Sequence, residues 1–339
     1  MNILLTGGMG YIGSHTAVAL TAAGHRVVLY DNLSNSSVDV LGRLAEITGQ
    51  TLPFIHADIR ATQTLVKTLK THAIDAVIHF AGLKAVGESV EKPIDYYANN
   101  VAGTISLLEA LRATAIQTLV FSSSATVYGD PQYLPLDEQH PLSVTNPYGR
   151  CKLHIEEILS DVVHADPHWK IACLRYFNPV GAHDSGLIGE NPAGIPNNLM
   201  PYVARVAARQ LPEVRVFGHD YPTPDGTGVR DYIHVMDLAE GHAAALTYLA
   251  THPGWHALNL GTGQGYSVLE MINAFAAASG QPIPHQITPR RPGDVAQCYA
   301  NPAKARETLG WSARRTLNEM CASTWRFQQK LANRNTSQD

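Results

Sequence analysis

The sequence of 339 residues predicts an α/β fold, in which a doubly wound parallel sheet is followed by a smaller α/β lobe. Two observations in its first half indicate this class. Short apolar runs alternate with helix-like segments, and a cluster of glycines follows the first apolar run. The expected strands are Ile3–Thr6, Val27–Tyr30, Leu52–His56, Ala76–Phe80, Leu119–Ser123 and Ile171–Tyr176.

Helical segments long enough to connect parallel strands lie between these runs. They are Tyr11–Ala23, Thr62–Lys70, Ile94–Ala113 and Tyr148–Val163, the last of which directly follows Pro147. Right-handed connections through such helices would bring the strands into one doubly wound sheet.

The alternation ends after about residue 177, where Gly, Pro and Asn become frequent. Asn178–Pro201 and Gly218–Gly228 are expected to be loops. Further helices are expected at Pro201–Arg209, Val235–Leu249 and Val268–Ala278. We therefore divide the chain at residue 177, with residues 178–339 mainly in the smaller lobe.

The composition is that of a globular protein, with 45% apolar and 16% charged residues. A net charge of −4 without a basic stripe gives no electrostatic reason to bind nucleic acid or an anionic membrane. The four cysteines, Cys151, Cys173, Cys298 and Cys321, lie far apart and are expected to be free thiols in a reducing compartment. With no signal-like N-terminus and no apolar run of membrane-spanning length, we expect a cytoplasmic protein.

The glycines at 7, 10 and 13 follow the first strand and open the first helix. A tight turn, the close approach of a pyrophosphate and close helix packing each require a residue without a side chain. The N-terminus of the helix then faces the anion. This arrangement predicts a Rossmann-type dinucleotide site.

Asp31 ends the second expected strand, 18 residues after Gly13. An acid near this spacing binds the ribose 2′-hydroxyl and would repel a 2′-phosphate, which favours NAD over NADP. The alternative is an ordinary turn residue before Asn32. Asp58 and Ile59, after the third strand, can cover an adenine, although a loop aspartate is a common feature without such a role.

Tyr148 and Lys152 stand four residues apart, on one face of the expected helix. A neighbouring ammonium favours phenolate, so we expect Tyr148 to act as a base well below its usual pKa of about 10. Ser124, after the fifth strand, lies at the carboxyl edge where doubly wound sheets bind ligands. Alone, the pair would fit a surface tyrosine packed over a lysine stem; with the glycine pattern it indicates a catalytic site.

These motifs resemble the extended short-chain dehydrogenase/reductase family and, within it, the UDP-sugar 4-epimerases. The resemblance extends from Met1 to about Arg326 and is carried by the segments 79–89 (HFAGLKAVGES), 122–129 (SSSATVYG) and 175–182 (RYFNPVGA). It implies that the two lobes exchange strands and helices along the chain. It also implies reversible C4 epimerisation of UDP-galactose and UDP-glucose through a 4-keto intermediate, with NAD as hydride carrier and Tyr148 as proton carrier.

Two sets of contacts follow from the resemblance. NAD contacts are implied for Gly7, Gly10, Tyr11, Ile12, Gly13, Asp31, Asn32, Asp58, Ile59, Phe80, Ala81, Lys84, Asn99, Ser124, Tyr148, Lys152 and Phe177. UDP-sugar contacts are implied for Asn178, Asn198, Leu199, Phe217, Arg230, Arg291 and Asp294. Arginine forks can chelate diphosphate oxygens, although exposed arginines also serve solubility alone.

Two other functions fit parts of the sequence. A nucleotide-sugar 4,6-dehydratase also oxidises C4, but related dehydratases carry Asp-Glu where this chain has Ala125-Thr126. An NAD-sensing protein without turnover would not need Ser124, Tyr148 and Lys152 together.

Three further expectations concern the range of UDP-sugars accepted, the oligomeric state and metal binding. Epimerases restricted to plain hexoses tend to carry tyrosine at the position of Cys298, so we expect N-acetylated UDP-sugars to be accepted, unless Tyr299 fills the space. A homodimer through Ile94–Ala113 and Tyr148–Val163 is implied by the resemblance. No metal is expected, because prolines interrupt the two histidine pairs of suitable spacing.

Overall fold

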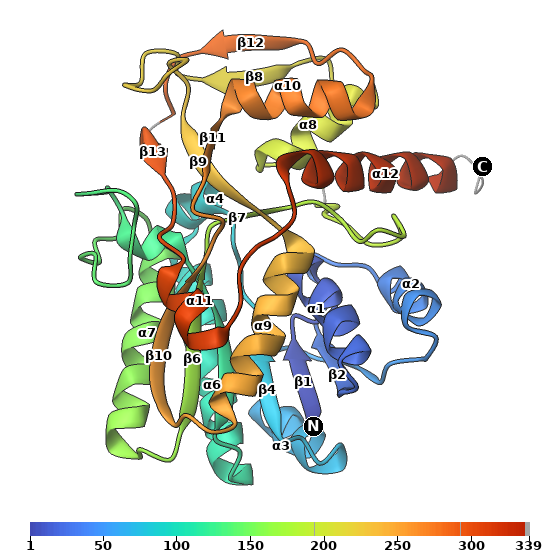
Figure 1. Ribbon diagram of the computed structural model, residues 1–339. Helices are drawn as coiled ribbons and strands as arrows, with labels where there is room; N and C mark the ends of the chain where they lie inside the picture. The colour runs from blue at the N-terminus through green and yellow to red at the C-terminus, as the bar shows by residue number, and fades with distance from the viewer. Residues whose placement is uncertain (193, 292, 336–339) are drawn as a thin grey trace.

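The computed structural model describes residues 1–192, 194–291 and 293–335, and it is built around one sheet of seven parallel strands. The strand order is β10-β6-β5-β4-β1-β2-β3, so the order reverses beside β1, as in doubly wound folds (Figure 1). The strands are β1 (Asn2–Thr6), β2 (Arg26–Asp31), β3 (Phe54–His56), β4 (Ala76–His79), β5 (Thr118–Ser124), β6 (Lys170–Tyr176) and β10 (Gly254–Leu260).

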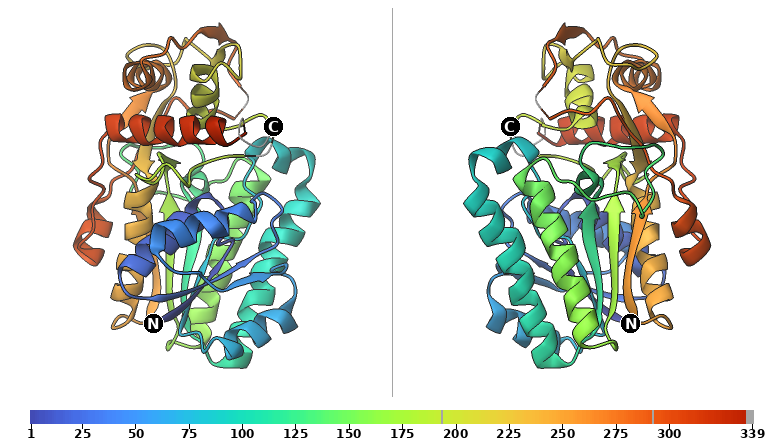
Figure 2. Two further views of the ribbon diagram at one scale, coloured as in Figure 1. Left: turned by 90° about the vertical axis from the view of Figure 1, so that its right-hand side faces the viewer. Right: turned by 90° about the vertical axis from the view of Figure 1, so that its left-hand side faces the viewer.

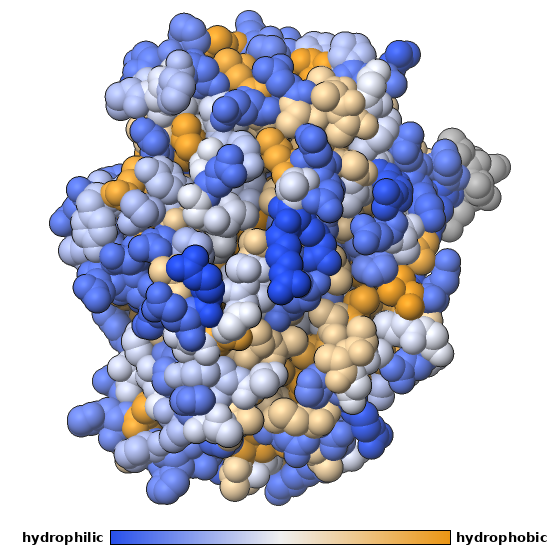
Figure 3. Space-filling view, viewed as in Figure 1, coloured by the Kyte–Doolittle hydropathy of each residue, from blue (hydrophilic) through white to orange (hydrophobic). Residues whose placement is uncertain are grey.

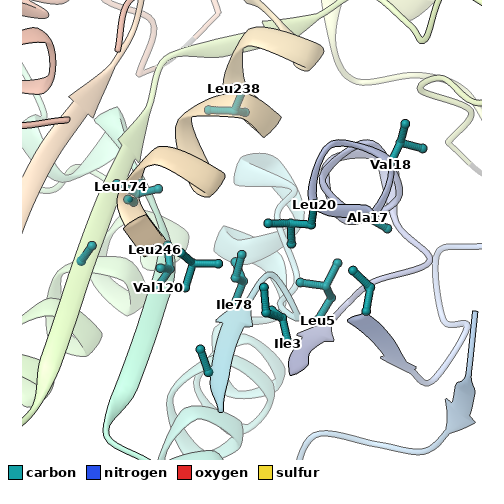
Figure 4. Packing of buried hydrophobic residues seen from close by; sticks show 14 of the residues in the cluster. Ile3, Leu5, Ala17, Val18, Leu20, Ile78, Val120, Leu174, Leu238 and Leu246 are labelled. Atoms are coloured by element: carbon teal, nitrogen blue, oxygen red, sulfur yellow. The ribbon is translucent and has the colours of Figure 1, made fainter. Parts of the chain in front are cut away.

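Helices cover both faces of this sheet, as Figure 2 shows. Alternate residues of β1 explain why: Ile3 and Leu5 are buried on one face, and Leu4 on the other. The first face packs against α1 (Tyr11–Ala22), α2 (Asp39–Thr48) and α9 (Val235–Leu249), in the cluster seen in Figure 4. The second packs against α3 (Thr62–Thr71), α6 (Ala102–Thr114) and α7 (Pro147–Ala165).

The segment expected as one helix at Ile94–Ala113 is divided. It consists of α5 (Pro93–Tyr96), a π-helical turn at Tyr97–Val101 and α6, and a short helix α4 (Val86–Glu91) precedes it. Inside the π turn, the Asn100 side chain accepts a hydrogen bond from the Leu83 N–H at 2.8 Å and donates one to the Leu83 carbonyl at 2.9 Å. These tertiary bonds accompany a helical irregularity that side-chain periodicity does not reveal.

The remaining elements form a smaller layer above the carboxyl edge of the sheet (Figure 1). One small sheet contains β7 (Asn178–Val180), β9 (Val229–His234), β11 (Gly265–Ser267) and β13 (Gln297–Cys298); a second pairs β8 (Val214–Phe217) with β12 (His285–Thr288). The helices of this layer are α8 (Leu199–Ala207), α10 (Val268–Ser279) and α12 (Leu317–Asn335), whereas α11 (Ala303–Leu309) packs against α9 and β10 of the large sheet. The chain returns to the large sheet between these elements, through α9 and β10. The division of the chain into two lobes at residue 177 remains a prediction.

The face of the molecule viewed in Figure 1 mixes polar and apolar side chains, with strongly hydrophilic ones gathered near its centre (Figure 3). Among the described residues, no helix combines the length and apolarity that a membrane crossing requires.

Candidate active site

The glycine loop after β1 forms a cradle in which side chains do not fit. Gly7 has a φ of +69°, and a Cβ there would lie 2.7 Å from the Ala81 nitrogen. At Gly13 it would lie 2.3 Å from the Gly7 carbonyl oxygen. Gly10 occupies the N-cap of α1 and provides no side-chain cap, so the first N–H groups of the helix are available to an anion. The loop therefore fits a pyrophosphate.

The Asp31 carboxylate is fastened to the glycine loop. Its oxygens accept hydrogen bonds from the Met9 N–H at 3.1 Å, the Leu33 N–H at 2.8 Å and the Ser36 hydroxyl at 3.1 Å. An ionised carboxylate has about four lone-pair sites, so capacity remains for a ribose hydroxyl. Tertiary contacts thus give this residue more than the role of a turn former.

Asp58 lies beside Asn32 at the next strand end. The Asn32 amide donates to Asp58 at 3.1 Å, and Arg60 binds the same carboxylate through two nitrogens, at 2.8 and 2.9 Å. The hydrogen bonds from Arg60 hold the pKa of Asp58 well below its usual range. Ile59 is buried, and a Cβ at Gly103 would lie 2.7 Å from its side chain. Asn32, Asp58 and Ile59 therefore lie together at the carboxyl edge of the sheet, after β2 and β3.

The residues after β4 lie at the same edge of the sheet. The Phe80 N–H donates to the Thr6 carbonyl at 2.9 Å, which keeps Phe80 and Ala81 close to the glycine loop. Asn99 lies in the π turn, where its amide donates to Asn100 at 2.9 Å. The structure therefore brings the predicted NAD residues from several strand ends to one edge of the sheet.

The predicted catalytic residues meet at the same edge, two strands from the glycine loop. Asn146 caps α7, accepting a hydrogen bond from the Gly149 N–H at 2.8 Å, and Tyr148 follows in the first turn. Tyr148 is hydrogen-bonded to Ser124 at the end of β5. The Lys152 ammonium lies 5.8 Å from the Tyr148 ring centre and donates to the Ser122 carbonyl at 2.5 Å.

The expected low pKa of Tyr148 is not found in the structure without ligands. Tyr148 is half-buried. Desolvation of its phenol by the surrounding protein raises the pKa of Tyr148 to about 12, although the hydrogen bond to Ser124 lowers it. Burial lowers the pKa of Lys152 to about 8, so its ammonium is itself costly here. The i, i+4 spacing placed the two groups correctly, but it contained no information about desolvation.

The predicted substrate residues occupy the smaller layer and differ in exposure. Arg230 on β9 is half-buried, and its Nη1 donates to the Val229 carbonyl at 2.8 Å. Phe217 and Arg291 form an outer rim: the guanidinium carbon of Arg291 lies 5.5 Å from the Phe217 ring centre, and Arg291 forms an ion pair with Asp294 at 2.9 Å. This rim reaches solvent, with 56% of the Arg291 side chain exposed.

Three further residues predicted to contact the UDP-sugar lie at the starts of elements of the smaller layer. Asn178 starts β7 and is exposed, whereas Phe177 before it is buried. Asn198 and Leu199 stand at the start of α8, with no side-chain cap from Asn198.

Glu190 joins the two sides of the site and was missed by the sequence reasoning. Its Oε1 accepts hydrogen bonds from the Lys84 ammonium at 3.1 Å and from the Asn198 amide at 2.7 Å. Only 9% of the Glu190 side chain is exposed. Because Lys84 and Asn198 lie 114 positions apart (198 − 84), no local sequence signal indicated this bridge.

Cys298 lies at the inner end of the substrate side. It pairs with Arg230 across β13 and β9, and it packs against a buried cluster that includes Phe177 and Val127. Burial raises the pKa of the Cys298 thiol to about 11, so it is a small neutral group. Tyr299 is directed elsewhere: a Cβ at Gly265 would lie 3.4 Å from its ring. Tyr299 therefore packs against β11, on the side of Gly265.

The whole chain matches known proteins. The model of the family described as GDP-mannose 4,6 dehydratase matches residues 4–324. UDP-glucose 4-epimerase of Bacillus subtilis is 57% identical over 333 residues, covering 98% of each chain. The chain belongs to the UDP-glucose 4-epimerase family.

Two solved structures of this family agree closely with the fold. The enzyme of Stenotrophomonas maltophila, with bound NAD and formylated UDP-arabinopyranose, is 51% identical and has a TM-score of 0.97, covering 98% of this chain and 99% of that chain. That of Bifidobacterium longum, in complex with NAD⁺ and UDP, is 53% identical, with a TM-score of 0.95 and the same coverage. Both the predicted fold class and the predicted family resemblance are confirmed.

Proposed function

We propose that this protein interconverts UDP-galactose and UDP-glucose by inverting C4, with Tyr148 as the group that removes and returns the proton. The observation that carries the assignment is the meeting of Tyr148, Ser124 and Lys152 at the sheet edge that also holds the glycine cradle. Family membership supports the same reaction.

NAD is the cofactor, and the residues at the edge fit it. A side chain at Gly7 or Gly13 would strike backbone atoms, the first N–H groups of α1 have no side-chain cap, and Asp31 is placed for a ribose hydroxyl. The glycines, the free N-terminus of α1 and Asp31 would hold the nucleotide. When bound, its nicotinamide accepts a hydride from the sugar and returns it.

The protein moves the proton. Ser124 is placed to orient the C4 hydroxyl toward the Tyr148 oxygen, which accepts its proton in one half of the cycle and returns it in the other. Because burial raises the pKa of Tyr148, the phenolate needs a neighbouring cation, and the Lys152 ammonium provides that charge. Arg230 and Arg291 would grip the diphosphate while the 4-keto sugar turns its other face.

The dehydratase reaction is disfavoured by the residues beside Ser124. Eliminating water across C5 and C6 needs an acid and a base, but Ala125 and Thr126 occupy the positions of the Asp-Glu pair. Thr126 instead donates its hydroxyl hydrogen to the Ser124 oxygen at 3.0 Å. Product analysis discriminates, because a dehydratase product lacks one molecule of water.

The first test is to incubate purified protein with UDP-galactose, without added NAD, and to separate the nucleotide sugars by chromatography. UDP-glucose should appear until a constant ratio is reached. In Tyr148→Phe we expect turnover to fall by about 10²–10⁴-fold, the usual contribution of general acid–base catalysis. Tyr133→Phe, at an exposed tyrosine, serves as the control. Near-normal turnover by a folded Tyr148→Phe variant would contradict the assigned role, and persistence of UDP-galactose with NAD supplied would contradict the substrate.

We further propose that UDP-N-acetylglucosamine and UDP-N-acetylgalactosamine are interconverted. The small thiol of Cys298 and the diversion of Tyr299 toward Gly265 support room for an acetamido group. In Cys298→Tyr, turnover of the N-acetylated sugars should fall by about tenfold or more, since about 1.4 kcal/mol of crowding is a factor of ten. Cys298→Ala is the small-residue control. Equal activity of the tyrosine variant toward both sugar classes would refute the proposal.

We also infer a cytoplasmic homodimer. Free thiols at Cys151 and Cys173 agree with a reducing compartment. Val90 and Ile94 are 63% and 80% exposed, and α4 and α5 contact α7, which supports a dimer surface on these helices. Light scattering should give twice the chain mass of 36.7 kDa, and Ile94→Glu should lower it.

A further inference from the structure

Three successive turns of α7 contact the three serines that end β5. Tyr148 bonds to Ser124, the Lys152 ammonium to the Ser122 carbonyl at 2.5 Å, and Glu156 to the Ser123 hydroxyl at 2.5 Å. The first two turns contain the catalytic pair, and the third has so far no role. Since residues four apart share a helix face, Glu156 continues the catalytic stripe into the interior.

Glu156 is held on its far side by Arg175 on β6. The two side chains are each 2% exposed, and Arg175 donates to both Glu156 oxygens, the closest contact being 2.6 Å. Arg175 also donates to the Tyr128 hydroxyl at 3.0 Å. In the sheet register Arg175 lies opposite Ser123, so the pair connects α7, β5 and β6 at one point.

We propose that Glu156 is a positioning residue of the active site. Through Ser123 and Arg175 it fixes the end of β5 against α7, and so keeps the Lys152 ammonium and the Ser124 hydroxyl in register with Tyr148. The inference rests on the proposed function, because it concerns proton transfer by that trio.

A buried ion pair is a poor way to gain stability alone, since packed apolar residues of similar volume often serve as well. This pair also fixes the orientation of the Glu156 carboxylate and places its negative charge near Lys152. The titratable groups facing Lys152 are Tyr148, Cys151 and Glu156 on α7, Cys173 on β6 and His79 on β4. Burial raises the pKa of Tyr148 and of both thiols and lowers that of His79 to about 3, so these four groups are neutral at neutral pH. Glu156 is therefore the anion of this group, and it favours the charged form of Lys152.

The test compares Glu156→Gln with the double variant Glu156→Gln/Arg175→Met by measuring kcat and KM for UDP-galactose between about pH 6 and pH 10. Loss of the anion disfavours the Lys152 ammonium, so in the single variant the alkaline limb of kcat should move down by about one pH unit. We expect kcat to fall about tenfold with KM within about twofold of wild type. The double variant also removes the unpaired cation, so its alkaline limb should move back toward the wild-type position.

Asp237→Asn is the matched control. Asp237 is a fully buried acid that accepts hydrogen bonds from the backbone and guanidinium of Arg315, away from the trio. It should lower the melting temperature without moving the alkaline limb. If Glu156→Gln lowers kcat only as far as this control does and leaves the limb unmoved, the inference is overturned.

A milder variant covers the case in which Glu156→Gln does not fold. Ser123→Ala removes one contact of Glu156 and leaves its ion pair with Arg175 in place. We expect kcat to fall several-fold with KM and melting temperature nearly unchanged; wild-type kcat in this variant would overturn the inference. Failure of the wild-type protein to epimerise UDP-galactose would instead refute the proposed function, so the two failures are distinguishable.

Discussion

In the cradle around Gly7 and Gly13, backbone atoms lie so close together that one added carbon would overlap them. At the rim of the substrate side, by contrast, 56% of the Arg291 side chain is exposed and Phe217 is 40% exposed. If both regions bind ligand as proposed, the cradle does so by fixed backbone geometry, whereas the rim uses long side chains that keep their conformational freedom.

The difference suggests how each region responds to change. A backbone cradle cannot relax easily around an added atom, so a small substitution there should weaken binding strongly. An exposed guanidinium is screened by water and salt, so its loss should have a graded effect.

The largest effect is expected at the cradle. Gly13→Ala places a Cβ 2.3 Å from the Gly7 carbonyl oxygen, and displacement of the loop by about 1 Å should weaken NAD binding by about 100-fold. The NAD content of the purified protein and its affinity for added NAD measure this. Gly42→Ala is the control, because nothing lies within 4 Å of a Cβ at that helical position. Normal NAD content in Gly13→Ala would remove the basis of the comparison.

A second prediction concerns acid and the buried layer below the cradle. Burial lowers the pKa of His79 to about 3, so between pH 6.5 and pH 3 the unfolded chain binds a proton that the folded chain does not. Stability is therefore lost as the pH falls through this window. Between pH 6.5 and pH 5 the contribution of His79 is about 2 kcal/mol.

Denaturant unfolding at pH 7 and pH 5 tests this prediction. In His79→Asn the loss of unfolding free energy between the two pH values should be smaller than in wild type by that amount. His168→Asn, at a side chain that is 84% exposed, should behave as wild type. If His79→Asn loses as much unfolding free energy between pH 7 and pH 5 as wild type does, His79 does not cause the loss of stability in acid.

The smallest effects are expected at the arginines. Arg230→Lys and Arg291→Lys retain the charge but lose the planar fork. We expect KM for UDP-galactose to rise about tenfold for the half-buried Arg230 and about threefold for the exposed Arg291. Repeating the assay at high salt should reduce the Arg291 effect more. The reverse ranking would show that the rim holds the diphosphate more tightly than the inner strand does.

Local patterns were sufficient for the elements that organise the sheet. The predicted helix Val235–Leu249 has the bounds of α9, and the predicted strands of the first half all occur, with ends shifted by one or two residues. The segment Ile94–Ala113 was predicted as one helix but is divided in the structure. There the Asn100 side chain bonds to the Leu83 backbone, and helical periodicity in the sequence does not reveal such a tertiary contact. The strand β13 has only two residues, too few for an alternating pattern, so it was not predicted.

The pKa of Tyr148 shows a second limit. The sequence placed Lys152 one helical turn from Tyr148, and the structure agrees. Desolvation of the phenol has the larger effect, however, and raises the pKa of Tyr148 to about 12. Desolvation depends on everything that packs nearby, whereas a motif describes only one neighbour.

By itself, the sequence determined the α/β class, the glycine loop, the acid at the end of β2 and the Tyr148–Lys152 pair, because each depends on a pattern of residues in neighbouring segments of the chain. The tertiary structure alone decided that Glu190 bridges Lys84 and Asn198, that Tyr299 lies toward Gly265, and that Glu156 meets Arg175 beyond the proposed catalytic pair. Each of these arrangements depends on contacts between different strands, helices or loops. Their geometry follows from how strands and helices pack, and no local period encodes it.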